Sequence, residues 1–168
     1  MPPTFSCPSS PTVASSGQYK DYAVNAGGTT LSDCCPERSN TCDGVGYKNS
    51  KVRFGDILDG NSNTFLLMEQ ASTIRTFNKP TNPFLWLNHQ SQGLAISNQG
   101  TRSYPPNAAP TLFLSAWKLI GRASWGFHPG GVQVSLCDGS VRFVTDTIAQ
   151  VPWRAAHTRD GAEAILLP

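Results

Sequence analysis

The feature that most constrains the fold is one alternating stretch, GGVQVSLCDGSVRFVTD, which runs from Gly130 to Asp146. Apolar residues recur at every second position, which is the period of a strand with one buried face. Asp138 and Gly139 stand between two such runs. An Asp-Gly pair in that place is a strong signal for a two-residue hairpin turn whose central residues both have positive φ. We therefore expect a β-hairpin over 132–145.

A two-residue turn would also set the register of this hairpin. Leu136 would lie opposite Val141, and Val134 would lie opposite Phe143. One face would then be apolar and the other mixed, because successive side chains of a strand point to opposite faces. The expected apolar face consists of Val132, Val134, Leu136, Val141 and Phe143.

The same stretch holds a histidine and an aspartate that could suggest a reactive site. A strand rises about 3.3 Å per residue, so Val132 and Asp138 would lie about 20 Å apart. A catalytic or metal-binding pair of His128 and Asp138 is therefore not expected. Asp138 and Gly139 are interpreted as turn residues and His128 as a packing or hydrogen-bonding residue near the start of the strand. Cys137 is expected to be a half-exposed thiol beside the turn, not a nucleophile.

Other regular elements are short. Strands are expected within KDYAVNAGG (20–28) and at Thr64–Glu69. Asp56 is expected to cap a single helical turn that continues through Leu58. A tight turn should follow over Asp59–Asn63.

The carboxyl-terminal part of the chain predicts two further elements. The apolar residues near Trp153 are spaced for a short helix over 148–156, and we expect Pro152 to interrupt it. The closing EAILL (163–167) is strand-like.

Loops are expected to make up much of the chain. Three segments lack apolar periodicity: an extended start over 1–18, a cysteine-containing loop over 29–50 and a long loop over 79–110. A chain of 168 residues is long enough for one domain with a core of its own. The sequence therefore predicts a single α+β domain in which strands and loops dominate, with an antiparallel sheet and one or two short helices.

Charge and hydropathy exclude several classes of protein. The chain has 13 Lys and Arg against 11 Asp and Glu, which is not the basic footprint of a nucleic-acid binder. No apolar stretch reaches the roughly 20 residues of a membrane-spanning helix. Charged residues make up only 14% of a chain with five cysteines, which favours an oxidising, extracellular location.

An odd number of cysteines leaves at least one thiol unpaired or paired between chains. Cys34 and Cys35 are neighbours and rarely pair with each other, but either could form a disulfide with Cys42 and close a small loop. Reduced thiols are the alternative. Cys7 and Cys137 are the candidates for free or intermolecular thiols.

One calcium-like pattern occurs at Asp59, Asn61 and Asn63, which occupy positions 1, 3 and 5 of an EF-hand loop. The rest of the pattern fails, because the sixth position is Thr64 where glycine is required. An Asx-rich turn that closes its own hydrogen bonds is therefore favoured over a calcium site of another type.

No catalytic constellation is evident. The three histidines, His89, His128 and His157, lack zinc-ligand spacing with any cysteine pair. There is no Gly-x-Ser-x-Gly elbow and no phosphate-binding glycine loop. The aromatic residues could line a sugar-binding face, but in a domain poor in Leu and Ile they are expected to form the core. We therefore expect no enzymatic activity and no cofactor, with calcium as the one alternative.

Five blocks of sequence, in order, carry a resemblance to a known family. They are CPSSP (Cys7–Pro11), DYAVNAG (Asp21–Gly27), ILDGNSNTFLLMEQ (Ile57–Gln70), the His128-x9-Asp138-Gly139 motif and TRDGAE (Thr158–Glu163). With these blocks the chain resembles a large family of secreted bacterial proteins, classed as a domain of unknown function. Its members begin with a prepilin-type segment and end with a His-x9-Asp-Gly motif.

The resemblance implies a type IV pilin-like or pseudopilin-like protein. In such proteins a long amino-terminal helix anchors and polymerises the subunit, and an antiparallel sheet forms the exposed head. This chain starts near the CPSSP block without that helix, so it is expected to be either a processed or excised head or a subunit that assembles through its head alone. Family members usually carry a further cysteine near the helix that could pair with Cys7. Here Cys7 is expected to be free or to have another partner.

Two functions follow from these observations. The first is a non-enzymatic structural protein of the cell surface that self-associates into a filament or an envelope assembly. Its loops over 29–50 and 79–110 would be the contact surfaces. The alternative is an extracellular module that binds a glycan or another ligand, with or without calcium.

Overall fold

The computed structural model describes part of the chain, and of residues 93–95 it describes the backbone alone. The described residues are 4, 6–10, 21–27, 42–47, 49–70, 93–95, 105–107, 124–162 and 167.

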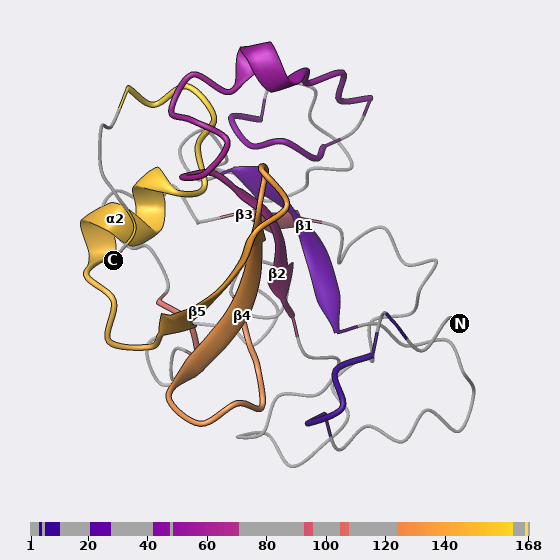
Figure 1. The fold of residues 1–168 in the computed structure, drawn as a ribbon, viewed down its shortest axis with the longest axis vertical. Helices are drawn as coiled ribbons and strands as arrows, with labels where there is room; N and C mark the ends of the chain where they lie inside the picture. The colour runs from indigo at the N-terminus through magenta and orange to yellow at the C-terminus, as the bar shows by residue number, and fades with distance from the viewer. Residues whose placement is uncertain are drawn as a thin grey trace, which may run out of the picture.

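One sheet organises this part of the chain (Figure 1). Its strands are β1 (Tyr22–Gly27), β2 (Phe65–Glu69), β3 (Gly93–Ala95), β4 (Gly131–Leu136) and β5 (Val141–Thr145). They lie in the order β3-β1-β2-β4-β5. Neighbouring pairs among β1, β2, β4 and β5 are antiparallel, and β3 pairs in parallel with β1 at one edge. The predicted α+β class with an antiparallel sheet is confirmed.

β3 corrects one expectation, because it lies inside the segment 79–110 that was expected to be loop. Its three residues, Gly-Leu-Ala, are too few to show a periodic pattern in the sequence. Parallel pairing with β1 is a long-range backbone contact. A propensity argument about so short a stretch cannot detect it.

The core lies between one face of the sheet and the helix α2 (Gln150–Ala155). Figure 1 shows α2 beside the hairpin of β4 and β5. Trp153 of α2 packs against Phe65 of β2, with ring centroids 5.1 Å apart. The buried apolar residues of this core are Ala23, Phe65, Met68, Val132, Val134, Leu136, Val144, Trp153, Ala156 and Leu167.

Pro152 does not interrupt the helix as expected. It occupies the third position of α2, within the first turn. The N–H groups of a first turn have no acceptor within the helix, so a proline there costs no hydrogen bond.

The helical turn that was expected to begin at Asp56 lies before it. It is the 3-10 helix η2 (Phe54–Asp56), and Asp56 is its last residue. The Asp56 carboxylate accepts a hydrogen bond from the Arg53 N–H, 2.8 Å away, and so caps the amino-terminal end of the turn.

The predicted hairpin is present, but its predicted register is wrong by one residue. Ser135 lies opposite Val141, and Gln133 lies opposite Phe143. The loop therefore contains three residues, 137–139. The Leu136 N–H donates to Ser140 O at 2.8 Å, and the Gly139 N–H donates to Leu136 O at 3.0 Å.

Gly139 explains the longer loop. Its φ is +86°, whereas Asp138 does not have a positive φ. A turn followed by a left-handed residue is the usual three-residue hairpin, and glycine adopts that conformation without a steric penalty. The Asp138 carboxylate accepts hydrogen bonds from the Oγ of Ser140 (2.7 Å) and from its N–H (2.9 Å). These bonds, led by the one from the hydroxyl, lower the pKa of Asp138.

The change of register reverses the two faces of β5. Val144 is buried and lies opposite Val132, while Val141 is 67% and Phe143 is 44% exposed. A shift of one residue moves every side chain of a strand to the other face. Because β5 carries apolar residues on both faces, its pattern is compatible with either register. The predicted apolar face is right for β4 and wrong for β5.

A substitution tests the role of Gly139. We expect Gly139→Ala to lower the free energy of unfolding by about 1 kcal/mol, because a Cβ is strained at this positive φ even though no atom would collide with it. The matched control is Gly55→Ala, a position that also has open space but no positive φ. Denaturant unfolding of both variants measures the difference. Equal stabilities would contradict the assigned turn.

The described end of the cysteine-containing loop runs beside β1. The Gly44 N–H donates to Ala26 O at 3.1 Å, and the Gly46 N–H donates to Asn25 O at 2.8 Å. The Arg159 guanidinium donates to the carbonyl oxygens of Cys42 (2.6 Å) and Gly44 (2.7 Å). Backbone pairing and one arginine therefore hold this end of the loop.

Within the described ranges, no helix combines the length and the apolar character needed to cross a membrane.

Candidate functional site

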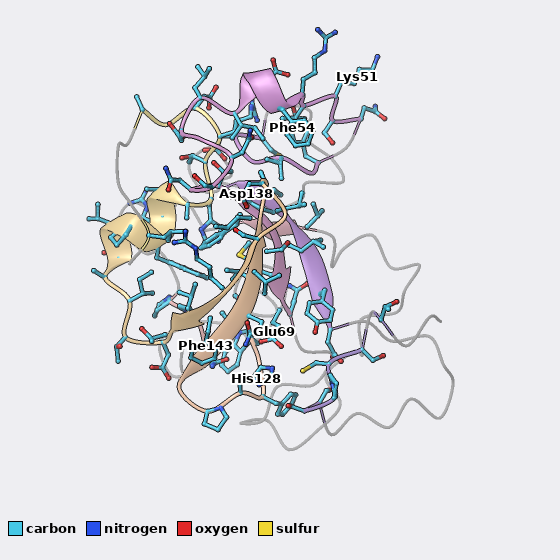
Figure 2. All side chains as sticks on the ribbon, viewed as in Figure 1. Lys51, Phe54, Glu69, His128, Asp138 and Phe143 are labelled. Carbon is cyan, nitrogen blue, oxygen red and sulfur yellow. The ribbon has the colours of Figure 1, made fainter. Side chains whose placement is uncertain are left out.

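Three side chains from distant parts of the sequence meet at one end of the sheet. The Nε2 atom of His128 lies 3.0 Å from Oε1 of Glu69 and 3.5 Å from the Sγ of Cys7. Glu69 is 1% exposed and Cys7 is 6% exposed, whereas the His128 side chain is 28% exposed. We call these three residues the Cys-Glu-His cluster. Figure 2 shows His128 next to Glu69, with Asp138 at the opposite end of the hairpin.

Hydrogen bonds hold Glu69 at its carbonyl oxygen and at one of its two carboxylate oxygens. It is the last residue of β2, and its carbonyl oxygen accepts hydrogen bonds from Ser124 Oγ (2.7 Å) and the Trp125 N–H (3.0 Å). Its Oε2 accepts a hydrogen bond from the Gln133 N–H at 2.8 Å. Its Oε1 is buried and has no well-aligned hydrogen-bond donor. That oxygen is the one that faces His128.

Cys7 is positioned by its backbone. Its N–H donates to Oδ2 of the buried Asp21 at 2.9 Å, and its carbonyl oxygen accepts from the Ser10 N–H at 3.0 Å. Burial raises the pKa of the Cys7 thiol, the Ser9 N–H lowers it, and Glu69 and Asp21 raise it. Burial, together with the negative charges of Cys7, Glu69 and Asp21, raises the pKa of Tyr22 to about 12.

The loop that carries His128 is braced by Asn107. Its Oδ1 accepts from the Gly126 N–H at 2.9 Å, and its Nδ2 donates to Gly131 O at 3.1 Å. Gly126 lies against Glu69, and a Cβ at this position would collide with the Glu69 carboxylate. Glycine is therefore needed here for the close approach of the loop to β2.

The cluster does not have the geometry of a nucleophilic relay. In a relay, the nucleophile and the orienting carboxylate contact opposite nitrogens of the histidine ring. Here Cys7 and Glu69 both approach Nε2. A raised thiol pKa also disfavours the reactive thiolate. The three ligand atoms lie within 4.8 Å of one another, so of the described residues these are the ones that could hold a metal ion.

The two ends of the His-x9-Asp-Gly motif are not brought together. His128 belongs to the Cys-Glu-His cluster, and Asp138 lies at the far end of the hairpin (Figure 2). There the Asp138 N–H donates to Asn61 O at 3.0 Å, and the Cys137 N–H donates to Thr64 O at 2.9 Å. The hairpin turn therefore docks onto the turn over Asp59–Asn63. The expected separation of His128 and Asp138 is confirmed.

Cys137 is not half-exposed as expected. It is a free thiol that is only 6% exposed, and its Sγ lies 3.8 Å from Phe65 O. Burial, with a smaller effect of the Asp138 charge, raises its pKa to about 11. The hairpin turn packs onto the Asp59–Asn63 turn and covers this thiol. A prediction from the hairpin alone could not include that contact.

Asp59, Asn61 and Asn63 form a turn that binds its own chain. The Asp59 carboxylate accepts hydrogen bonds from the N–H groups of Gly161 (2.8 Å) and Ala162 (2.9 Å). Nδ2 of Asn63 donates to Asp59 O at 3.2 Å. These contacts join the ILDGNSNTFLLMEQ block to the TRDGAE block. Calcium binding at this turn stays a prediction.

The remaining candidates are buried or lie outside the described residues. Cys7 forms no disulfide with another described cysteine, and an intermolecular disulfide at Cys7 stays a prediction. Cys42 is fully buried and packs with Tyr47, whereas Cys34 and Cys35 are outside the described ranges, so the predicted disulfide stays a prediction. His157 is buried, and its Nδ1 lies 2.7 Å from Trp153 O. His89 is also outside the described residues.

Sequence reasoning did not associate Cys7 with Glu69 and His128. Glu69 reads as one more residue of a buried strand, and no short-range spacing connects the three. The one available signal was that each lies in a different block of the family resemblance.

The comparisons with known proteins give one match. The sequence profile of a family described as "Protein of unknown function (DUF1559)" matches residues 2–151, a span that includes the whole Cys-Glu-His cluster. No curated protein and no solved structure matches the chain. Since the profile covers most of the sequence, the chain belongs to this family of proteins of unknown function, DUF1559.

Proposed function

We propose that the chain is a non-enzymatic structural protein of the cell surface, a pilin-like head that self-associates into a filament or an envelope assembly. The observation that supports this proposal is the pair of exposed apolar side chains on β5, Val141 and Phe143. Both lie on the face of β5 that points away from the core, where Val141 is 67% and Phe143 is 44% exposed. The secreted, pilin-like character suggested by the sequence blocks is consistent with such a role.

The outer face continues from β5 across the sheet. Leu67 of β2 lies opposite Ser135 of β4, which lies opposite Val141 of β5. Leu67 is 36% exposed. A groove of about 330 Å³ opens on this side, and its lining residues are Thr4, Tyr22, Leu67, Gln133, Val134, Ser135 and Val141. We call this surface the outer-face groove.

A second copy of the chain is the occupant that suits this surface best. Among the described strands, β5 is the last of the sheet on its side. Strands at such an edge can pair with a strand of another molecule, and exposed apolar side chains beside them add buried area. Arg142, between Val141 and Phe143, is the kind of charged residue that limits uncontrolled pairing at an edge.

Self-association can be tested with a double substitution. We expect the wild-type protein to form oligomers or filaments in sedimentation and electron microscopy, and Val141→Ser with Phe143→Ser to weaken association by about tenfold or more. The control is Val151→Ser, which removes a 64% exposed side chain from α2. A wild-type protein that stays monomeric at every concentration, or a double variant that assembles normally, would contradict the proposal.

The alternative is an extracellular module that binds a glycan or another ligand. Of its four tryptophan candidates, Trp125 and Trp153 are buried and present no stacking surface to a sugar, whereas Trp86 and Trp117 lie outside the described residues. A calcium-dependent module would use the turn at Asp59. Two further measurements on protein that does not assemble test this alternative. Binding on a glycan array, or a fall in melting temperature when calcium is chelated, would favour it.

A further inference from the structure

The Cys-Glu-His cluster has the spacing of a coordination sphere. Zinc–ligand distances of about 2.0–2.3 Å in tetrahedral geometry place ligand atoms about 3.4–3.6 Å apart. The Cys7 Sγ to His128 Nε2 distance of 3.5 Å matches this spacing, whereas the Glu69 Oε1 to Nε2 distance of 3.0 Å is shorter, so a bound ion would move that pair apart by about 0.4 Å. All three atoms lie within 4.8 Å of one another. We propose that Cys7, Glu69 and His128 bind one divalent transition-metal ion of the zinc type.

The carboxylate of Glu69 provides an observation that is independent of spacing. The residue is 1% exposed, and Oε1 has no well-aligned hydrogen-bond donor. The nearest polar neighbour of Oε1 is Nε2 of His128 at 3.0 Å, and a buried carboxylate oxygen whose only such contact is poorly aligned is costly. A single N–H at His128 Nε2 also cannot be directed at both the sulfur and the oxygen. A cation between the three atoms would satisfy Oε1 and would use the ring nitrogen as an acceptor.

The surroundings of the cluster support fixed ligands. The Gln133 N–H holds the second carboxylate oxygen of Glu69 at 2.8 Å. Oδ2 of the buried Asp21 holds the backbone N–H of Cys7 at 2.9 Å. Metal sites depend on such outer contacts to orient their ligands. The collision that a Cβ at Gly126 would cause shows how closely the His128 loop is packed on Glu69.

The ligand types select the class of metal. Calcium and magnesium prefer oxygen ligands alone, whereas thiolate and imidazole ligands suit zinc and related transition metals. One thiolate and one carboxylate would balance the charge of a divalent ion, which is favourable in a buried place. Three protein ligands leave a fourth position for water or another donor.

The experiment is a titration of metal-free, reduced protein with Co²⁺, followed by displacement with Zn²⁺. We expect one equivalent of Co²⁺ to produce the absorption of a tetrahedral site together with a thiolate charge-transfer band. Cys7→Ser and His128→Gln should remove the band and weaken binding by more than about 100-fold, since even outer-shell partners contribute 10- to 100-fold.

Two controls separate this site from other thiols. Cys137→Ser removes a buried thiol at the far end of the hairpin and should leave binding unchanged. A variant in which Cys34, Cys35 and Cys42 are all serine should likewise keep one equivalent bound. Circular dichroism confirms that each variant is folded, and His128→Gln is the safer of the two ligand variants because this side chain is 28% exposed.

The proposal is overturned by any of three results. The first is that folded wild-type protein binds no Co²⁺ with a thiolate band. The second is that folded His128→Gln and Cys7→Ser bind as tightly as the wild type. The third is that binding is lost in the triple serine variant and kept in His128→Gln. Each result would identify the cluster as a set of side-chain contacts that do not bind a metal ion.

Discussion

Replacing Trp153 with alanine is expected to lower the free energy of unfolding by about 3–5 kcal/mol. The side chain is 1% exposed and joins α2 to the sheet. Its ring lies 5.1 Å from Phe65 and 4.7 Å from His157, measured between centroids. Removing it would leave a cavity in the core and would break both aromatic contacts. Chemical denaturation measures the loss directly.

The matched control for Trp153→Ala lies two residues earlier in the same helix. Val151 is 64% exposed, so Val151→Ala should change stability by no more than about 0.5 kcal/mol. The comparison separates core packing from helix propensity, because both substitutions place alanine in α2. A loss of less than 1 kcal/mol for Trp153→Ala would mean that α2 does not pack on this sheet.

The second large effect is acid destabilisation through His157. Burial lowers the pKa of His157 to about 4, although the hydrogen bond with Trp153 O raises it. In the unfolded chain the pKa is about 6.5, so the unfolded state binds the proton more readily. Stability from this residue is therefore complete above pH 6.5 and is lost as the pH falls toward 4. The linkage amounts to about 3 kcal/mol between pH 7 and pH 4.

Unfolding measured at several pH values tests this contribution. The variant His157→Gln should lose the steep fall between pH 6.5 and pH 4, while effects of carboxylates elsewhere remain in both proteins. The difference between the two unfolding curves isolates the histidine. An identical pH dependence in the wild type and His157→Gln would show that His157 is solvated.

The sequence was most informative where local rules dominate. Alternation located β1 and β4, a short apolar run located β2, and Asp138-Gly139 marked the hairpin between β4 and β5. It was least informative for polar residues that act over long range. Asn25 is one of these: its Nδ2 donates to Phe65 O and to His157 O, both at 2.9 Å. An asparagine within a strand pattern carries no signal for such partners.

In the candidate site, too, local sequence signals were visible and long-range contacts were not. His128 was visible as part of a motif, but its partners were not, because spacing along the chain says nothing about which strand ends lie together. The order of β2 and β4 in the sheet brings Glu69 to the loop before Gly131. Asp21 then places Cys7 beside both. Each contact depends on a fold that a short sequence window does not contain.

The sequence by itself determined the strand-dominated α+β class and the position of the hairpin. Only the tertiary structure decided the register of β5 and the meeting of Cys7, Glu69 and His128. The physical reason is that alternation has a period of two and is satisfied by either face of β5. Burial of Val144 against Val132 selects one face, and that selection exposes Val141 and Phe143.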